Sequence, residues 1–243
     1  MIKPYFFFSF FLLVLCENVF SQSTFSLPPS ENPPFLVNKD YVHGMGVYTY
    51  NDQVADTTIK RACESSMQDL HSNTFLSVYI EIFQDGNQKY YEFPELSVMD
   101  SSFTFSEEVH SVETQINNGF VYCFSSTDNS LKEFTSNIPD LESLALAPIS
   151  KNGIWYSLGI TNELVNNKNR SWLIAKNEAA KRLSKTISTS IKSKTIQNNE
   201  ETENFAYFKT NIIYRNIVVA KRVIMDGKYY SVIAVSGDDI TSF

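Results

Sequence analysis

Histidine is scarce in this chain, and the signature motifs of several enzyme classes are missing. The 243 residues include three histidines, His43, His71 and His110, which lie far apart in the sequence. None belongs to an HExxH motif or lies at zinc-ligand spacing from acidic residues, and the chain has no Gly-x-Ser-x-Gly elbow. The segment His43-Gly44-Met45-Gly46 lacks the third glycine of a dinucleotide-binding loop. We therefore expect no metal, no cofactor and no catalytic residue.

Long apolar runs are missing beyond the N-terminus. The run Tyr5–Leu15 follows a single charge, Lys3, and is too short to span a bilayer. This pattern predicts a signal peptide over residues 1–21, and hence export to the periplasm or the outer-membrane periphery, or secretion. A lipid anchor at Cys16 is the less favoured alternative, because Leu15 is larger than the residue that lipoprotein processing requires. Residues 22–38 contain four of the eight prolines and predict an extended tether.

Cysteine is scarce as well. Removal of the signal peptide leaves two of the three cysteines, Cys63 and Cys123. An even pair in an exported protein can form a disulfide. Two buried thiols are the alternative, because a domain of this size needs no cross-link. Both alternatives remain open at the level of sequence.

Apolar residues are plentiful, at 43% of the chain with 14% aromatic, and their spacing indicates structural elements. In the first half, a helix over about Gln53–His71, with Asp52 as its N-cap, has a stripe of Ala55, Ile59, Ala62, Cys63, Met67 and Leu70. The other predicted elements are strands at Tyr41–Tyr50 and Thr74–Phe83, and a hairpin of Val109–Ile116 and Phe120–Phe124 closed at Asn118-Gly119. Lys89–Met99, interrupted by Pro94, receives no assignment.

The second half shows a similar order. A helix is predicted from Asn169 or Ser171 to about Lys185, with a stripe of Trp172, Ala175, Ala179 and Leu183. The other predicted elements are strands at Ile154–Ile160 and Ile187–Ile196, a short helix within Glu200–Tyr214, and a hairpin of Ile217–Ile224 and Lys228–Val235 turned at Asp226-Gly227.

The two halves match when one is aligned on the other. Placing Gly46 on Gly159 also places Ala62 on Ala175 without a gap, and a slightly shorter shift places Asn118-Gly119 on Asp226-Gly227. We therefore predict an α+β fold of two tandem β-α-β-β-β units, each an antiparallel sheet with a helix packed on one face. The first repeat spans residues 39–126, a linker spans 127–152, and the second repeat spans 153–243.

Charge differs between the halves. Residues 22–150 contain 5 basic and 18 acidic residues, a net charge of −13, whereas residues 151–243 contain 14 and 8, a net charge of +6. Such halves can attract each other within one chain or between chains. The candidate binding residues are the basic side chains Lys176, Lys181, Arg182, Lys185, Lys192 and Lys194. They could bind an anionic envelope polymer, lipid headgroups or the acidic first half, or form a solvated helix face.

Three segments of the second repeat carry a family resemblance. They are "WYSLG" at Trp155–Gly159, "AKNEAAKRLSKTI" at Ala175–Ile187 and "VVAKRVIMDGKYYSVIAV" at Val218–Val235. With these segments the repeat resembles the Lpp-twenty family of bacterial envelope lipoproteins and is similar to the N-terminal domain of the flagellar protein FlgT. Ile224-Met225 departs from the aromatic residue common there. The resemblance implies an outer-membrane or periplasmic protein with a scaffold-type role.

These observations lead to one expectation and two alternatives. We expect a non-enzymatic exported protein of the bacterial envelope that acts in assembly or scaffolding, through other envelope proteins or further copies of itself. The first alternative is a binding module for an anionic envelope glycan or lipid, and the second is an enzyme of unrecognised class. No feature points to nucleic acid as a partner.

Overall fold

The structure is a computed structural model that describes residues 41–85, 88–98, 111–130, 138–165, 167–196 and 205–243. The predicted signal peptide and tether lie outside these residues. The first half contains β1 (Tyr41–Thr49), α1 (Ala55–Thr74), β2 (Phe75–Asp85), β3 (Gln88–Val98), β4 (Ser111–Asn117) and β5 (Phe120–Ser130). The second contains α2 (Leu141–Leu146), β6 (Ile149–Lys151), β7 (Ile154–Asn162), α3 (Lys168–Ile196), β8 (Phe205–Arg215), β9 (Val218–Met225), β10 (Lys228–Ser236) and β11 (Ile240–Ser242).

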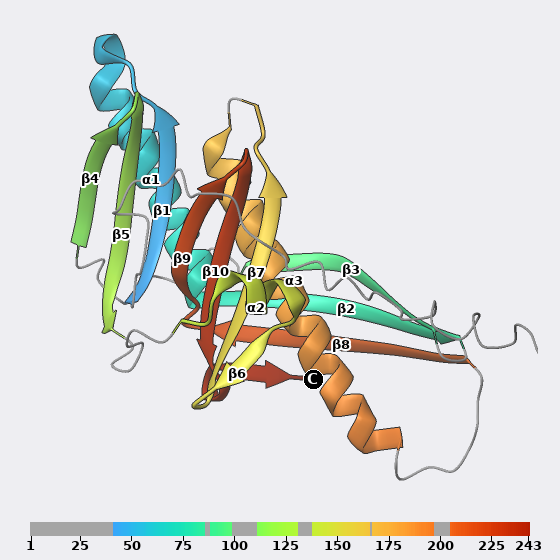
Figure 1. The fold of residues 1–243 in the computed structure, drawn as a ribbon. Helices are drawn as coiled ribbons and strands as arrows, with labels where there is room; N and C mark the ends of the chain where they lie inside the picture. The colour runs from blue at the N-terminus through green and yellow to red at the C-terminus, as the bar shows by residue number, and fades with distance from the viewer. Residues whose placement is uncertain (1–40, 86–87, 99–110, 131–137, 166, 197–204) are drawn as a thin grey trace, which may run out of the picture.

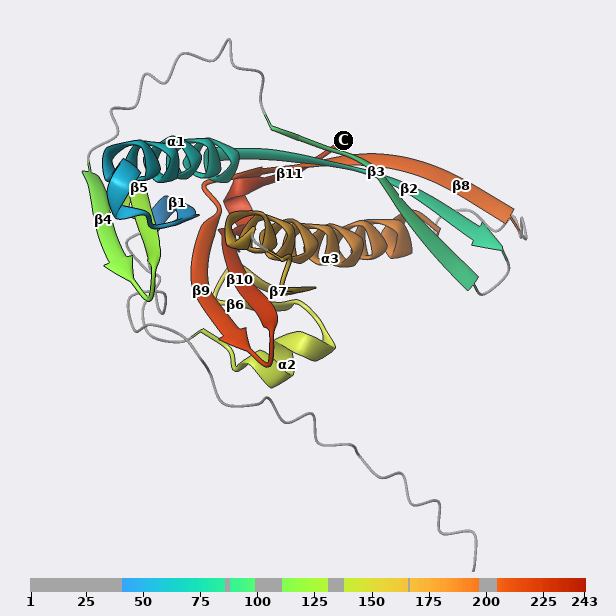
Figure 2. The ribbon, with the colours of Figure 1, turned by 90° about the horizontal axis from the view of Figure 1, so that it is seen from above.

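The strands form three antiparallel sheets, in the orders β1-β5-β4, β6-β7-β10-β9 and β11-β8-β2-β3. The first two sheets lie in a row, with β9 beside β1, and α1 and α3 cover the same face of this row (Figures 1 and 2). This arrangement confirms the predicted α+β fold. Figure 2 also shows α3 enclosed between the second and third sheets, which explains why Ala179, Ala180 and Leu183 are fully buried.

Both predicted hairpins are present, and each turns where the sequence indicates. Asn118-Gly119 connects β4 to β5 and Asp226-Gly227 connects β9 to β10. All four residues have positive φ angles, between 48° and 73°. Two consecutive residues with positive φ form the tight turn that matches the twist of an antiparallel pair, and Asn, Asp and Gly adopt it at low cost.

The same strand–helix contact occurs in both halves, at positions that the alignment of the halves pairs. A Cβ atom on Gly46 would lie 1.8 Å from the Ala62 carbonyl oxygen, and one on Gly159 would lie 1.9 Å from that of Ala175. The hairpins keep this register, because Gly46 pairs with Cys123 and Gly159 pairs with Ser231. Each glycine therefore lets a helix backbone rest directly on a strand.

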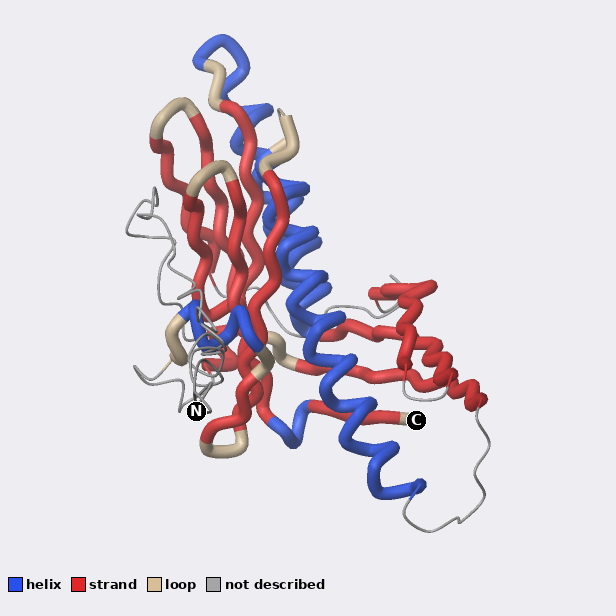
Figure 3. The backbone as a smooth tube through the Cα atoms, turned by 45° about the vertical axis from the view of Figure 1, so that its right-hand side comes forward, coloured by secondary structure: helices blue, strands red, loops and turns tan. Residues whose placement is uncertain are grey.

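The third sheet takes its strands from both halves. All eleven residues of β2 pair with β8, from Phe75 with Arg215 to Asp85 with Phe205. The sheet projects beyond α1 along α3 (Figures 1 and 3). Each half thus has its own small sheet and helix, and the two halves also share a sheet.

Several local predictions are wrong. Residues 187–196 continue α3 instead of forming a strand, because Leu183, Ile187 and Ile191 recur at every fourth position and fit a helix. Residues 205–214, predicted as helical, form β8, where Ile212 and Tyr214 are buried at a spacing of two. The predicted cap Asp52 lies inside a 3₁₀ turn that the Asn51 side chain caps, and α1 begins at Ala55 without a side-chain capping hydrogen bond.

Lys89–Met99, which received no assignment, is described as far as Val98 and lies in β3. Pro94 is tolerated because β3 is at the edge of its sheet, and the pairing with β2 shifts register between Tyr79 and Glu81. Among the described residues, no helix is both long enough and apolar enough to cross a bilayer.

Candidate functional site

A pocket of about 220 Å³ lies between α1 and α3, where the two halves meet. Four residues of each helix form its walls, and β1 and β9 contribute one residue each. The lining residues are Met45, Ser65, Gln68, Asp69, Ser72, Asn169, Trp172, Leu173, Lys176 and Arg222. The spacing of these residues along each helix, in steps of one, three or four, places them on a single helix face.

Lys176 of α3 is 2% exposed and reaches into the first half. Its ammonium group donates to Asp69 Oδ1 at 2.6 Å, to Asn73 Oδ1 at 2.7 Å and to the Ser72 hydroxyl. Ser72 uses its own proton for the Asp69 carbonyl, and the Asn73 amide donates to the His43 carbonyl. All three partners of Lys176 therefore act as acceptors, which requires three N–H bonds and hence the charged ammonium form.

Arg222 of β9 crosses the seam between the two sheets. Its Nη1 donates to His43 Nε2 at 2.5 Å, and its Nη2 lies 3.4 Å from Asp69 Oδ2. The other ring nitrogen of His43, Nδ1, lies 2.9 Å from the Tyr41 carbonyl oxygen and donates to it. A ring that donates at Nδ1 and accepts at Nε2 is neutral.

The electrostatics of the cluster follow from burial. Burial acts to raise the pKa of Asp69, but the charges of Lys176 and Arg222 outweigh it and hold this pKa below its ordinary value. Burial lowers the pKa of Arg222 to about 10, which leaves it cationic at neutral pH. Burial also lowers the pKa of Lys176, and the charge and hydrogen bond of Asp69 oppose this effect. The described cluster thus holds two cations and one carboxylate.

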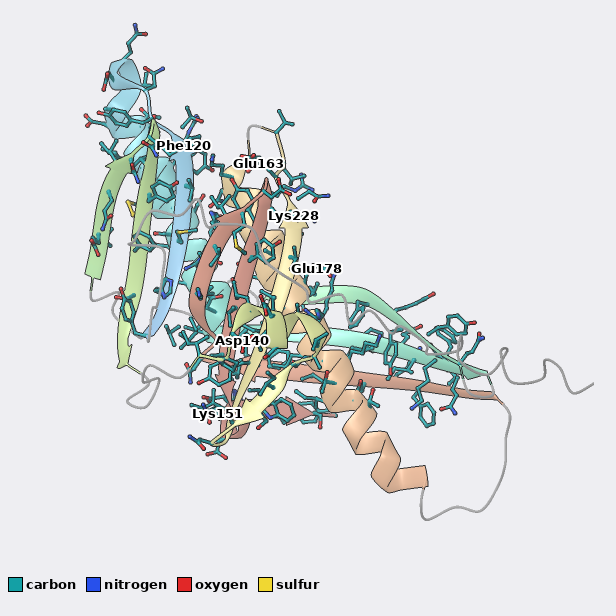
Figure 4. All side chains as sticks on the ribbon, viewed as in Figure 1. Phe120, Asp140, Lys151, Glu163, Glu178 and Lys228 are labelled. Atoms are coloured by element: carbon teal, nitrogen blue, oxygen red, sulfur yellow. A yellow bond between two sulfur atoms is a disulfide. The ribbon has the colours of Figure 1, made fainter. Side chains whose placement is uncertain are left out.

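The basic residues predicted as a binding site are not brought together as one surface. Lys176 is buried and contacts the acidic first half, one of the partners considered for it. Lys181 pairs with Glu178 of its own helix at 2.8 Å (Glu178 is labelled in Figure 4). Lys192 and Lys194 lie in the last turns of α3 rather than on a strand.

Arg182 and Lys185 lie at a second location. Arg182 is half-buried and donates to the carbonyl oxygens of Leu158 and Ala145 at 2.7 and 2.9 Å. Lys185 is exposed and lies 4.5 Å above the Tyr91 ring. Both line an open groove of about 670 Å³ with residues from β3, α3, the end of α2 and the segment that follows it, namely Tyr91, Leu146, Ala147, Pro148, Thr186 and Thr189.

A third pocket, of about 350 Å³, lies where Phe120 and Glu163 come together at one end of the two sheets (Figure 4). Lys168 lies 4.5 Å above the Phe120 ring and 3.6 Å from Glu163. The Val47 amide donates to Asn169 Oδ1 at 3.2 Å. These contacts join the halves at this end, so the pocket is part of the same seam.

Cys63 and Cys123 form a disulfide, with their Cα atoms 5.1 Å apart, which resolves the two alternatives left open by the sequence. The bond joins α1 to β5. Among the residues that the structure describes, no group of three or more His, Cys, Asp or Glu side chains could hold a metal ion.

Sequence reasoning did not identify five members of the cluster: His43, Asp69, Ser72, Asn73 and Arg222. The usable signal was the opposite charge of the halves together with Asp69 and Asn73, which lie one helical turn apart on α1.

Comparisons of the chain with models of protein families, with curated proteins and with solved structures found no match.

Proposed function

We propose that this chain is a non-catalytic exported protein of the bacterial envelope that acts in assembly, through contacts between copies of itself. The family resemblance and the N-terminal apolar run support export to the envelope. The disulfide between Cys63 and Cys123 supports the same compartment, because disulfides persist where the environment is oxidising. In the pocket between α1 and α3 the ionisable groups of Lys176, Asp69 and Arg222 are committed to one another, which favours a structural role over catalysis.

The observation that carries the proposal is the outer edge of β4. This edge strand pairs with β5 alone among the described strands. Val112 and Ile116 share one face of β4 and are 49% and 53% exposed, and Met67 of α1 is 42% exposed. The predicted buried stripe of α1 therefore extends beyond what its own sheet covers. An edge strand with exposed apolar side chains on one face and an edge that no described strand pairs with is a template for pairing with another chain.

The chain itself shows how such an edge is covered. The alignment that matches the two hairpin turns places β4 on β9, and β9 lies beside β1 of the other half. Val218, Ala220 and Val42 are fully buried in the cluster that spans this seam. The halves also carry net charges of −13 and +6. A second copy that presents its basic half to the β4 edge would complement it in the same head-to-tail sense.

Light scattering coupled to size-exclusion chromatography tests this proposal. The full chain is expected to associate as its concentration rises, and Ile116→Lys is expected to shift it to monomer, because a charge would be buried in the contact. Val165→Lys is the matched control, since Val165 is 86% exposed and lies in the loop before α3. A strict monomer at high concentration would contradict the proposal.

A binding module for an anionic envelope glycan or lipid is the second candidate. The groove that combines Tyr91 with Arg182 and Lys185 favours it, because it sets cations beside an aromatic ring. Sedimentation with isolated cell wall at low and high salt tests this function. Binding should weaken with salt and with Lys185→Gln but not with Lys60→Gln on α1. Absence of binding at both salt concentrations would exclude it.

A further inference from the structure

The pocket between α1 and α3 carries an excess of positive charge. Lys176 and Arg222 are 2% and 3% exposed and, among the residues that the structure describes, face one carboxylate, that of Asp69. His43 is neutral in this arrangement, so it does not change the balance. A buried charge without a counter-charge is unfavourable, and an anion within reach of the cluster would relieve it.

A second observation points in the same direction. Trp172 is 4% exposed and lines the pocket, and its indole N–H has no hydrogen-bond acceptor in the part of the chain that the structure describes. Indole can only donate, so the missing partner must be an acceptor. Trp172 and Lys176 are one turn apart on α3, and both residues line the pocket.

The other residues that line the pocket limit the size and polarity of a ligand that could bind there. Met45, Trp172 and Leu173 provide an apolar wall, while Ser65 and Asn169 provide polar groups. A volume of about 220 Å³ is smaller than the typical site for a drug-sized ligand. The excess of a single positive charge matches one negative charge rather than two.

We propose that this pocket binds a small monocarboxylate whose carboxylate faces Lys176, Arg222 and the Trp172 indole and whose apolar part lies against Met45 and Leu173. Because the pocket is built by both halves, the bound carboxylate strengthens their association and stabilises the fold in proportion to its concentration. This ligand site is independent of the β4 edge, so either proposal can fail without the other.

Trp172 provides the readout. The chain has two tryptophans, and Trp155→Phe leaves Trp172 as the single reporter. Titration of this variant with acetate and propionate at constant ionic strength should change its fluorescence saturably and raise its melting temperature. Acetamide, which has the shape of acetate without the charge, should do neither. An equal response to acetamide, or no response to either carboxylate, would overturn the proposal.

Inorganic phosphate is the third probe, because it distinguishes a carboxylate site from a general anion site. We expect phosphate to bind more weakly than propionate, since it has no apolar part and carries more charge than the cluster lacks. Tighter binding of phosphate would overturn the assignment to carboxylates.

Gln68 is exposed and lines the pocket, so substitutions there can test the effect of charge on ligand binding without disturbing the buried cluster. Gln68→Glu should weaken acetate binding about tenfold and Gln68→Lys should strengthen it by a similar factor, because each changes the charge beside the ligand. Gln53→Glu is the matched control, since Gln53 is also exposed and does not line the pocket. Equal affinities in all three variants would contradict the proposed site.

Discussion

At the scale of single residues, the joint between the halves depends on Lys176. Its ammonium donates to three acceptors, and each acceptor is held in place by a further hydrogen bond of its own. A long cation buried with its full set of partners fixes the position of α3 against α1 more specifically than apolar packing does. The opposite charge of the two halves is thus used inside the chain.

Lys176→Met should lower the free energy of unfolding by about 3 kcal/mol, because removal of one partner leaves buried acceptors and a carboxylate less well paired. Urea denaturation followed by circular dichroism measures this loss. Lys60→Met is the control, since Lys60 pairs with Glu64 at the surface at 3.9 Å and should have little effect. Equal stability of the two variants would show that the buried cluster contributes nothing.

Stability should also depend on the ionisation of Asp69. Its folded-state pKa is held below the ordinary value of 3.8, so the unfolded chain binds the proton more readily than the folded chain. The stabilisation is therefore present above that pH and is lost as the pH falls through the folded-state pKa. Urea denaturation between pH 2 and about 7 should show this loss in the parent chain, and Asp69→Asn should reduce the dependence. An unchanged profile in the variant would assign acid unfolding to other carboxylates.

At the scale of elements, strand and helix touch through backbone rather than side chains. Gly46 and Gly159 occupy equivalent places, and Ser157, which the same alignment pairs with Gly44, donates from its hydroxyl to the Ala179 carbonyl at 2.7 Å. The second half thus accommodates a serine at this position, whereas a Cβ on Gly44 would lie 1.8 Å from the Ser66 carbonyl oxygen. The backbone contact explains why the helices present alanine and serine at their buried faces.

Gly46→Ala and Gly159→Ala should each cost at least about 3 kcal/mol of stability, because the added methyl group would meet a helix carbonyl. Thermal unfolding of both variants measures the cost. Gly237→Ala is the control, since its nearest heavy atom would lie 3.2 Å away, and it should cost much less. A cost at one glycine alone would mean that the two contacts are not equivalent.

At the scale of the whole molecule, the two halves are joined at several places. Arg222 and Lys176 reach across the seam, β9 lies beside β1, and β8 pairs with β2 along its full length. Separation of the halves would expose both buried cations. It would also break the pairing between β2 and β8. We therefore expect the molecule to unfold as one cooperative unit although its sequence is repetitive.

A fragment of residues 153–243 expressed alone should not reach a stable fold, because its buried Lys176 and the paired edge of β8 need the first half. Amide dispersion in a proton–nitrogen NMR spectrum measures this directly. Addition of a fragment of residues 39–152 should restore dispersion. A well-dispersed spectrum of the second half alone would show that the shared sheet is dispensable.

Local sequence signals predicted what local interactions decide. The hairpin turns at Asn118-Gly119 and Asp226-Gly227 were predictable because few residues tolerate positive φ. The equivalence of Gly46 and Gly159 was visible in the alignment of the two halves, because a helix backbone in contact with a strand excludes a side chain at that position. Residues 187–196 were assigned wrongly because a short polar stretch with scattered isoleucines fits both periods, and only packing selects one. Residues 205–214 were assigned wrongly because Phe205, Phe208 and Ile212 also fit helical spacing, although aromatic residues and isoleucine favour strands.

The sequence by itself therefore determined the α+β class, the duplicated strand–helix unit and the two hairpins, since each depends on residues close together in the chain. Only the tertiary structure decided that β2 and β8 form a shared sheet, that Cys63 is bonded to Cys123, and that Lys176 is buried rather than exposed. These outcomes depend on partners that are distant in the chain. Spacing along the chain carries no information about such partners. A lysine on a helix gives the same sequence pattern whether its side chain contacts water or a buried aspartate.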